Sequence, residues 1–294
     1  MALLIELTNL AGDYNVRGAV RFEEKRDMTG QWFVRYVAIG DSQTEGLHDG
    51  DERSGYRGWA DRLAEHLSEL NPRLRYANLA VRGSLARQVR AGQLPAALEL
   101  GPDLVTVCAG MNDVIRPRFD ADRVCGELDE VVAALAARGV RVVITTFPDI
   151  GKLMPIARRL VPRVIALNAG IRESAARHGA TLVDAFPHAA IADQRLYSAD
   201  RLHANAEGHA RIAAAVAHAL ELPGFDDGWT APLAPAPPRP WWSNARTEVS
   251  WLGGCVGPWI GRGLLGASSG NRRTAKRPLL APVAVRGDRE LSGR

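Results

Sequence analysis

The stretch YVAIGDSQTEG, residues 36–46, joins an apolar run to a turn of small and polar residues. The apolar run predicts a buried strand, and Gly40, Asp41 and Ser42 end it abruptly. A strand that only fills a core can end on any turn residues, whereas one that presents a serine at the edge of a sheet needs a sharp exit of small residues. The central question is therefore whether Ser42 is a nucleophile or an ordinary turn hydroxyl.

From Arg35 to Leu222, short apolar runs alternate with longer segments of helical period. This alternation is typical of an α/β protein with a mainly parallel sheet, doubly wound into three layers. The five expected strands, continuous in hydrophobicity because helices cover both faces, are residues 35–42, 76–81, 104–110, 141–149 and 180–186. The expected helices are residues 58–70, 120–138, 165–178 and 205–222, the last starting at Asn205, a residue suited to an N-cap.

Composition divides the chain into an N-terminal extension (1–34), an α/β domain (35–224) and a C-terminal tail (225–294). The tail contains the proline-rich stretch PLAPAPPRP, five of the seven tryptophans, and ten Lys or Arg against five Asp or Glu. So many aromatic residues lead us to expect that part of the tail packs on the body or on a partner. The rest of the chain is nearly neutral, which argues against nucleic-acid binding.

Three cysteines without CxxC spacing indicate neither a disulfide framework nor a zinc knuckle. The N-terminus lacks the basic start and apolar core of a secretory signal, and no stretch is apolar for long enough to cross a membrane. We therefore expect a cytoplasmic protein. The basic tail suggests weak contact with an anionic membrane surface, against the alternative of a solvated charge run. The oligomeric state is left open.

Four groups of polar or small residues lie where the expected strands or loops end: 40–42, 78–83, 110–113 and 200–203. In an open parallel sheet, ligands bind outside the carboxyl ends of the strands, so we expect these groups to meet at one edge.

Each group supplies a component of acyl-transfer chemistry. Ser42 becomes nucleophilic if an imidazole takes its proton while a carboxylate orients that imidazole, and Asp200 and His203 are suitably spaced to be that pair. A tetrahedral intermediate also needs hydrogen-bond donors for its oxyanion. The backbone N–H groups of Gly83 and Ser42 and the side-chain amide of Asn112 are the candidates.

The motifs GDSQTEG, NLAVRG, GMND and DRLH stand in this order in the chain. In these four blocks the sequence resembles the SGNH (GDSL-type) hydrolase superfamily, with Ser42, Gly83, Asn112 and the pair Asp200 and His203 at the matching positions. The resemblance implies a three-layer α/β/α sandwich with a five-stranded, flavodoxin-like sheet. It also implies a serine esterase or lipase that cleaves small-molecule esters or thioesters through an acyl-enzyme, with no metal and no cofactor.

Two other functions are considered. Asp41, Asp113, Asp200 and His203 could hold a divalent metal in a phosphoesterase, although no HxH or HExxH motif supports this. A binding module that kept the fold and lost the chemistry is the second, although none of the expected catalytic groups is missing.

The substrate pocket is expected between two loops, residues 47–58 and 145–162. Met154, Ile156 and Leu160 of the second loop are candidates for lining an acyl site, against the alternative of an ordinary apolar helix face.

Overall fold

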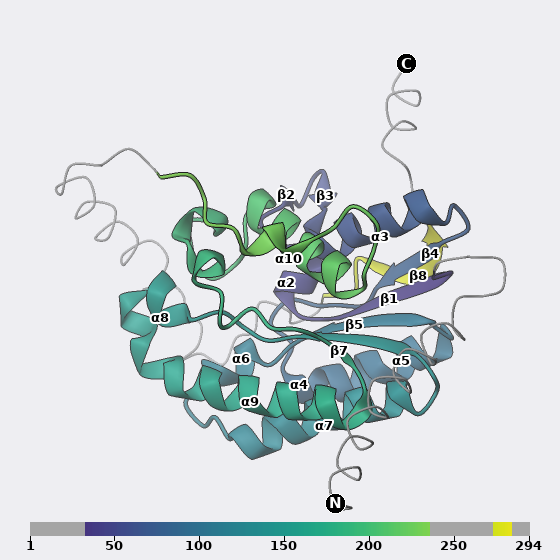
Figure 1. The fold of residues 1–294 in the computed structure, drawn as a ribbon. Helices are drawn as coiled ribbons and strands as arrows, with labels where there is room; N and C mark the ends of the chain where they lie inside the picture. Colours follow the sequence, from purple (N-terminus) through teal and green to yellow (C-terminus); the bar gives the residue numbers. More distant parts are fainter. Residues whose placement is uncertain (1–32, 236–272, 284–294) are drawn as a thin grey trace, which may run out of the picture.

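A six-stranded sheet forms the centre of the computed structural model, which describes residues 33–235 and 273–283 (Figure 1). Its order is β7-β6-β5-β1-β4-β8, and the first five of these strands run parallel. Without β8 this is the 2-1-3-4-5 order of flavodoxin-like sheets, so the predicted five-stranded sheet is confirmed. The strands are β1 (Arg35–Gly40), β4 (Arg75–Asn78), β5 (Leu104–Cys108), β6 (Arg141–Thr145), β7 (Thr181–Val183) and β8 (Arg277–Pro282).

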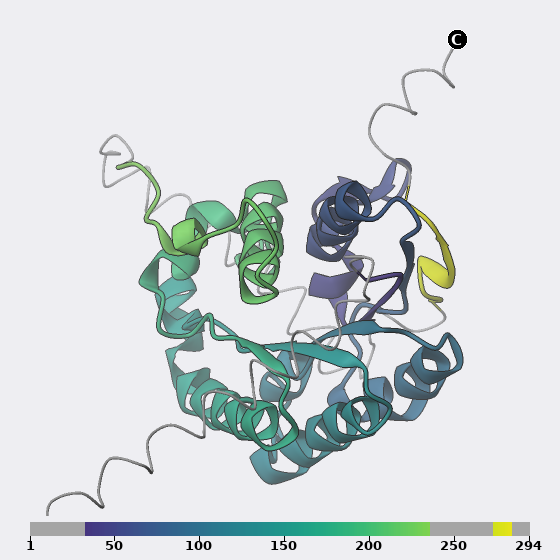
Figure 2. The ribbon, with the colours of Figure 1, turned by 45° about the vertical axis from the view of Figure 1, so that its right-hand side comes forward.

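Helices cover both faces of the sheet and complete the predicted three layers (Figure 1, Figure 2). Helices α3 (Gly58–Leu70) and α10 (Ala206–Ala219) pack together on one face. On the other face, α7 (Ala121–Ala136) packs against α9 (Val161–His178), beside α5 (Leu94–Glu99). Short helices stand near strand ends or between longer ones: α2 (Ser42–Glu45), α4 (Ala86–Gln88), α6 (Met111–Val114) and α8 (Ile150–Leu153).

The remaining elements are single turns and one hairpin. A two-stranded hairpin of β2 (Gly50–Asp51) and β3 (Gly55–Tyr56) precedes α3. The 3₁₀ helices are Pro155–Leu160, Ala189–Ala192, Gln194–Leu196 and Asp227–Thr230, and a π-helical turn spans Val89–Gln93.

The core explains why these segments take these forms. On α3, Trp59, Leu63 and Leu67 are fully buried, as the helical spacing predicts. At the start of α10 the side chain of Asn205 accepts hydrogen bonds from the backbone N–H groups of Glu207 and Gly208, which confirms the predicted N-cap.

The short helices α2, α6 and α8 and the β2–β3 hairpin were not predicted from the sequence, and neither were two further segments. Residues 86–99 form α4, the π-helical turn and α5, where Gly92 and Pro95 interrupt the sequence pattern of a single helix. The second is β8, which lies antiparallel to β4 at the edge of the sheet. Its Pro278 and Pro282 are typical of an edge strand and argue against a central one.

Strand β8 belongs to the predicted tail, so the expectation that part of the tail packs on the body is confirmed for these residues. Lys276, just before β8, forms an ion pair with Asp61 on α3. Trp229 packs at the border of the core, and the other four tail tryptophans, Trp241, Trp242, Trp251 and Trp259, lie outside the described residues. The division into extension, domain and tail stays a prediction.

None of the helices in the described ranges is both long and apolar enough to cross a membrane.

Candidate active site

Ser42 is the first residue of helix α2, directly after the end of β1. Gly40 makes this exit possible, because at its φ of 151° an added Cβ would lie 2.2 Å from the carbonyl oxygen of Cys108 on the neighbouring strand. The carboxylate of Asp41 then caps the helix by accepting from the backbone N–H of Gln43. The small residues after the apolar run therefore allow a tight strand-to-helix turn that presents Ser42 at the sheet's edge.

Ser42 forms a hydrogen-bonded chain at this edge with Asp200 and His203, which stand far from it in the sequence. Ser42 Oγ lies 2.8 Å from His203 Nε2, and His203 Nδ1 lies 2.6 Å from Asp200 Oδ2. The other oxygen of Asp200 accepts from the backbone N–H groups of Leu202 and His203, which fixes the turn. A hydroxyl, an imidazole and a carboxylate in this order can transfer a proton away from the hydroxyl.

The Asp200 carboxylate is held in its ionised form. Its partial burial would raise its pKa, but hydrogen bonds to His203 and His48 and the charge of His203 keep the pKa well below the ordinary value. A carboxylate that stays ionised can stabilise a positively charged imidazole throughout the neutral pH range.

His48 is a member of this site that sequence reasoning missed. Its Nε2 lies 3.2 Å from Asp200 Oδ2, the same oxygen that faces His203, and the two imidazole rings are 5.4 Å apart. His48 stands in the loop after α2 with a left-handed backbone, φ 71°. No motif or periodicity marks that position in the sequence.

Asn112, at the start of α6, points its amide toward the turn at Ser42. Its Nδ2 donates to Asp41 Oδ2 and to the carbonyl oxygen of Ser84, at 3.1 Å each. Gly83, the residue before Ser84, follows β4 and has a φ of 77°, which favours glycine. Asn112 therefore links the turn at Ser42 to the loop that contains Gly83.

The neighbouring Asp41 has an unusual environment for a carboxylate. Burial raises its pKa to about 6, although the backbone N–H of Gln43 and the charge of His203 lower it. Sequence reasoning considered Asp41 only as a metal ligand, and the structure instead places it between Gln43 and Asn112.

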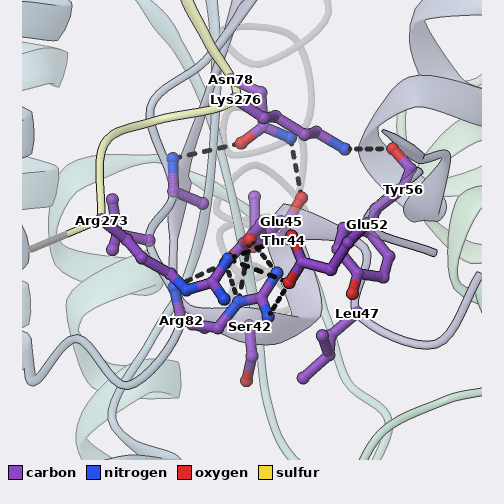
Figure 3. Close-up of polar contacts among 12 residues, drawn as sticks. Ser42, Thr44, Glu45, Leu47, Glu52, Tyr56, Asn78, Arg82, Arg273 and Lys276 are labelled. Carbon is purple, nitrogen blue, oxygen red and sulfur yellow. Dashed lines mark hydrogen bonds and ion pairs between the residues drawn. The ribbon is translucent and has the colours of Figure 1, made fainter. Parts of the chain in front are cut away.

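A second link between the turn at Ser42 and the loop of Gly83 lies behind Ser42. Glu45, at the end of α2, accepts from the backbone N–H, Nε and Nη2 of Arg82, the residue before Gly83. Figure 3 shows this cluster, with the hydroxyl of Ser42 pointing away from it. Arg82 also contacts Glu52, which in turn pairs with Arg273 ahead of β8.

A pocket opens at Ser42 and His203, and its lining joins polar residues of the site to apolar side chains of the loop after β6. The lining residues are Asp41, Ser42, Gln43, Met111, Asn112, Phe147, Pro148, Ile150, Leu153, Tyr197, Arg201, Leu202 and His203. Loop 145–162 therefore walls the pocket, but through Phe147, Ile150 and Leu153.

The three residues expected from that loop, Met154, Ile156 and Leu160, do not line the pocket. Ile156 is 56% exposed, whereas Met154 and Leu160 pack against the core. Packing therefore accounts for Met154 and Leu160, as the alternative held, whereas Ile156 is exposed to solvent. No residue of loop 47–58 lines the pocket, so the expectation that this loop forms the second wall is wrong. The loop contains the β2–β3 hairpin, and its His48 contacts Asp200.

The four groups expected for a metal-dependent phosphoesterase are not gathered. Asp41 binds Asn112, and Asp113 accepts from the backbone N–H of Ala86. Within residues 33–235 and 273–283, the His, Cys, Asp and Glu side chains close enough to share an ion are His48, Asp200 and His203.

The sequence model of the GDSL-like lipase/acylhydrolase family matches residues 38–211, more than half of the chain. The chain belongs to this family. Because this is a family of ester hydrolases, the chain is a carboxylic ester hydrolase. No curated protein matches the chain significantly.

Solved structures of similar fold agree with this assignment. LAE5, an alpha/beta hydrolase enzyme from the metagenome of Lake Arreo, Spain, is 27% identical, with a TM-score of 0.54 over 64% of this chain and 95% of its own. A catalytic mutant of Axe2, an acetylxylan esterase from Geobacillus stearothermophilus, is 20% identical, with a TM-score of 0.54 over 68% of this chain and 97% of its own. TesA is 22% identical, with a TM-score of 0.53 over 64% of this chain and 98% of its own. Axe2 and TesA are similar to this chain in fold alone.

Proposed function

We propose that this GDSL-like hydrolase cleaves carboxylic esters through a serine acyl-enzyme. The observation that supports the proposal most directly is the chain of contacts from Ser42 Oγ through both ring nitrogens of His203 to Asp200, at 2.8 and 2.6 Å. Such a chain needs no further group to activate a hydroxyl.

In the first half-reaction, Ser42 Oγ attacks the carbonyl carbon of the ester while His203 Nε2 takes the hydroxyl proton. Asp200 holds the other ring nitrogen and stabilises the imidazolium that forms. When the tetrahedral intermediate collapses, Nε2–H gives its proton to the leaving alkoxide, the alcohol departs, and the acyl group stays on Ser42.

The oxyanion is bound by the backbone N–H groups of Ser42 and Gly83 and by the side-chain amide of Asn112. In the free enzyme the Asn112 amide donates to Asp41 and Ser84. One of its N–H groups turns toward the oxyanion as the negative charge develops, in line with catalytic hydrogen bonds that tighten only with substrate bound.

In the second half-reaction, water gives a proton to His203 Nε2 and attacks the acyl carbon. The carboxylic acid leaves as Ser42 recovers its proton. The substrate class proposed is a small-molecule ester, with thioesters as the chemical alternative. A cytoplasmic location and weak membrane contact of the tail stay predictions.

The test is hydrolysis of p-nitrophenyl esters by the full chain and by Ser42→Ala and His203→Ala, with Ser54→Ala as the control on an exposed serine. The first two variants should lose about 10⁴-fold or more in kcat, and the control should keep the parent rate. A serine-directed phosphonate should label Ser42 by mass spectrometry. Activity that EDTA abolishes, or that acts on p-nitrophenyl phosphate instead, would contradict the proposal and favour the phosphoesterase.

The role of Asn112 is tested separately. Asn112→Ala should lower kcat about 10²- to 10³-fold with little change in KM, because the lost donor acts on the transition state. A variant with the parent kcat would remove Asn112 from the oxyanion site without affecting the serine mechanism.

A further inference from the structure

His48 makes the surroundings of Asp200 unlike those of a simple hydroxyl–imidazole–carboxylate chain. The Asp200 carboxylate faces two imidazoles at once, His203 at 2.6 Å and His48 at 3.2 Å, both on Oδ2. The His48 side chain is 43% exposed, whereas that of His203 is 15% exposed. Solvent therefore reaches the carboxylate from the side of His48.

The loop that positions His48 is fixed by several contacts. The buried ring of His209 accepts from the backbone N–H of Trp59 and has its other nitrogen 3.1 Å from the carbonyl oxygen of Leu47. Asp49 pairs with Arg62 at 2.7 Å. Contacts on both sides of His48 therefore hold its backbone in place.

We propose that His48, Asp200 and His203 form a binding site for a zinc ion, and that zinc bound there inhibits the hydrolase. The ligand atoms all lie within 4.8 Å of one another. Two imidazoles and one carboxylate suit Zn²⁺, which commonly takes three protein ligands and leaves a fourth position to water. The ion is an inhibitor in this proposal and takes no part in ester cleavage.

The separation of one pair of ligand atoms already matches that expected around a tetrahedral zinc ion. Zinc bonds of about 2.0–2.1 Å place neighbouring ligand atoms about 3.3 Å apart. His48 Nε2 and Asp200 Oδ2 already have nearly this separation, at 3.2 Å. The contact between Asp200 Oδ2 and His203 Nδ1, now 2.6 Å, must open by about 0.7 Å, which replaces a hydrogen bond by a shared ion.

Inhibition follows from the tautomer of His203. To accept the proton of Ser42, neutral His203 must have its own proton on Nδ1 and a lone pair on Nε2. Zinc on Nδ1 needs the lone pair there, so the proton resides on Nε2. Nε2–H cannot then take the proton of Ser42, and the Asp200 carboxylate is shared with the ion. The inhibition rests on the proposed serine mechanism, whereas the metal site itself does not.

The experiment uses the full chain, freed of metal with EDTA and dialysed, with the initial rate on p-nitrophenyl acetate measured against added ZnCl₂. His48→Asn is the test variant because asparagine tolerates the left-handed backbone at this position and its amide is a poor ligand for zinc. His66→Asn is the matched control, since His66 has a similarly exposed side chain (38%) on α3. Each rate is normalised to the same protein without metal.

We expect micromolar Zn²⁺ to inhibit the parent and His66→Asn, EDTA to restore both, and the inhibition constant of His48→Asn to be at least about tenfold higher. MgCl₂ should not inhibit, because Mg²⁺ prefers oxygen ligands. Equal inhibition of the parent and His48→Asn, or no inhibition of the parent, would overturn the proposal.

Isothermal titration calorimetry separates this proposal from the function. The parent should bind one zinc ion, and His48→Asn should bind it with lower affinity. This result does not depend on whether the protein hydrolyses any ester. Equal binding by both proteins would contradict the metal site. Binding without any esterase activity would instead contradict the serine mechanism and leave the site supported.

Discussion

Glu45 and Arg82 form a buried ion pair that joins the helix starting at Ser42 to the loop containing Gly83 (Figure 3). Glu45 lies three residues after the proposed nucleophile, and Arg82 lies one residue before a proposed oxyanion donor. Their side chains are 10% and 8% exposed, and Arg82 stacks over the ring of Tyr56 with 4.9 Å to the centroid. The pair therefore links two parts of the proposed catalytic machinery from outside the pocket.

Breaking this pair should lower both stability and turnover. Arg82→Met leaves the buried Glu45 carboxylate without its partner, at a cost of about 3 kcal/mol in the free energy of unfolding. Glu45→Gln should cost less, because Arg82 keeps its contact with Glu52. The double variant should cost less than the sum of the two, as urea denaturation of all four proteins would measure. Both single variants should lower kcat more than they change KM, because the proposed donors no longer align with the oxyanion. If the stability loss of the double variant equals the sum of the two single losses, the two charges do not interact.

The raised pKa of Asp41 predicts that the free energy of unfolding depends on pH. Its pKa is raised by burial from 3.8 to about 6, so between these values the folded protein holds a proton that the unfolded chain has released. The contribution of this carboxyl group to stability is complete below about pH 4 and is lost as the pH rises through 6. Over that window the loss is about 3 kcal/mol.

Asp41→Asn removes this titration and keeps an oxygen that accepts from Gln43. The variant should match the parent near pH 4 and be more stable than the parent at pH 7, as urea denaturation at the two pH values would measure. Asp61, whose pKa is also raised to about 6, is present in both proteins and cancels in the comparison. A difference that is the same at both pH values would contradict the raised pKa of Asp41.

Much of the site could be read from the sequence because its parts stand where strands end. In a parallel sheet those ends share one edge, so Ser42 after β1 and Asn112 after β5 lie close in space. His203 reaches the same edge from the turn before α10. The positions of the five strands likewise followed from local patterns of hydrophobicity, whereas the flavodoxin-like arrangement of the sheet was implied by the family resemblance.

The features that were missed depend on contacts between loops. His48 reaches Asp200 from a left-handed loop position, and Arg82 meets Glu45 across 37 residues. Strand β8 pairs with β4 about 200 residues away, and two prolines hide its strand character. No local periodicity encodes such pairings, because each partner is ordinary in its own segment.

The ion pair between Lys276 and Asp61 predicts how β8 is attached to the domain. Lys276 Nζ also donates to the carbonyl oxygen of Tyr56, and the Asp61 side chain on α3 is 19% exposed. Lys276→Met should cost about 2 kcal/mol at pH 7, because it leaves the carboxylate without its partner. The cost should shrink near pH 4, where Asp61 is protonated.

Two further variants check this assignment by urea denaturation at both pH values. Adding Asp61→Asn to Lys276→Met should recover most of the loss at pH 7, since no buried charge then remains. Arg273→Met is the control, because its partner Glu52 is well exposed and its removal should change stability little. A loss from Lys276→Met that is independent of pH would mean that packing of the side chain, and not its charge, attaches β8.

The position of Phe147 predicts that this side chain limits the length of the acyl chain that the pocket accepts. It lines the pocket at Ser42 and also a second, mostly apolar cavity, together with Gln43, Pro148 and Tyr197. The second cavity continues along Val183, Ile191, Leu196 and Ile212. Phe147 therefore stands between the nucleophile and a larger apolar space.

Phe147→Val should join the two cavities and let longer acyl chains enter. Each additional buried methylene contributes about 0.8 kcal/mol, or about fourfold in kcat/KM. The ratio of kcat/KM for p-nitrophenyl hexanoate over acetate should therefore rise by about tenfold or more relative to the parent. Ile150→Ala is the matched control, because Ile150 lines only the pocket at Ser42 and its truncation opens no passage. If both variants shift the ratio equally, the second cavity does not receive the acyl chain and the preference depends on pocket width alone.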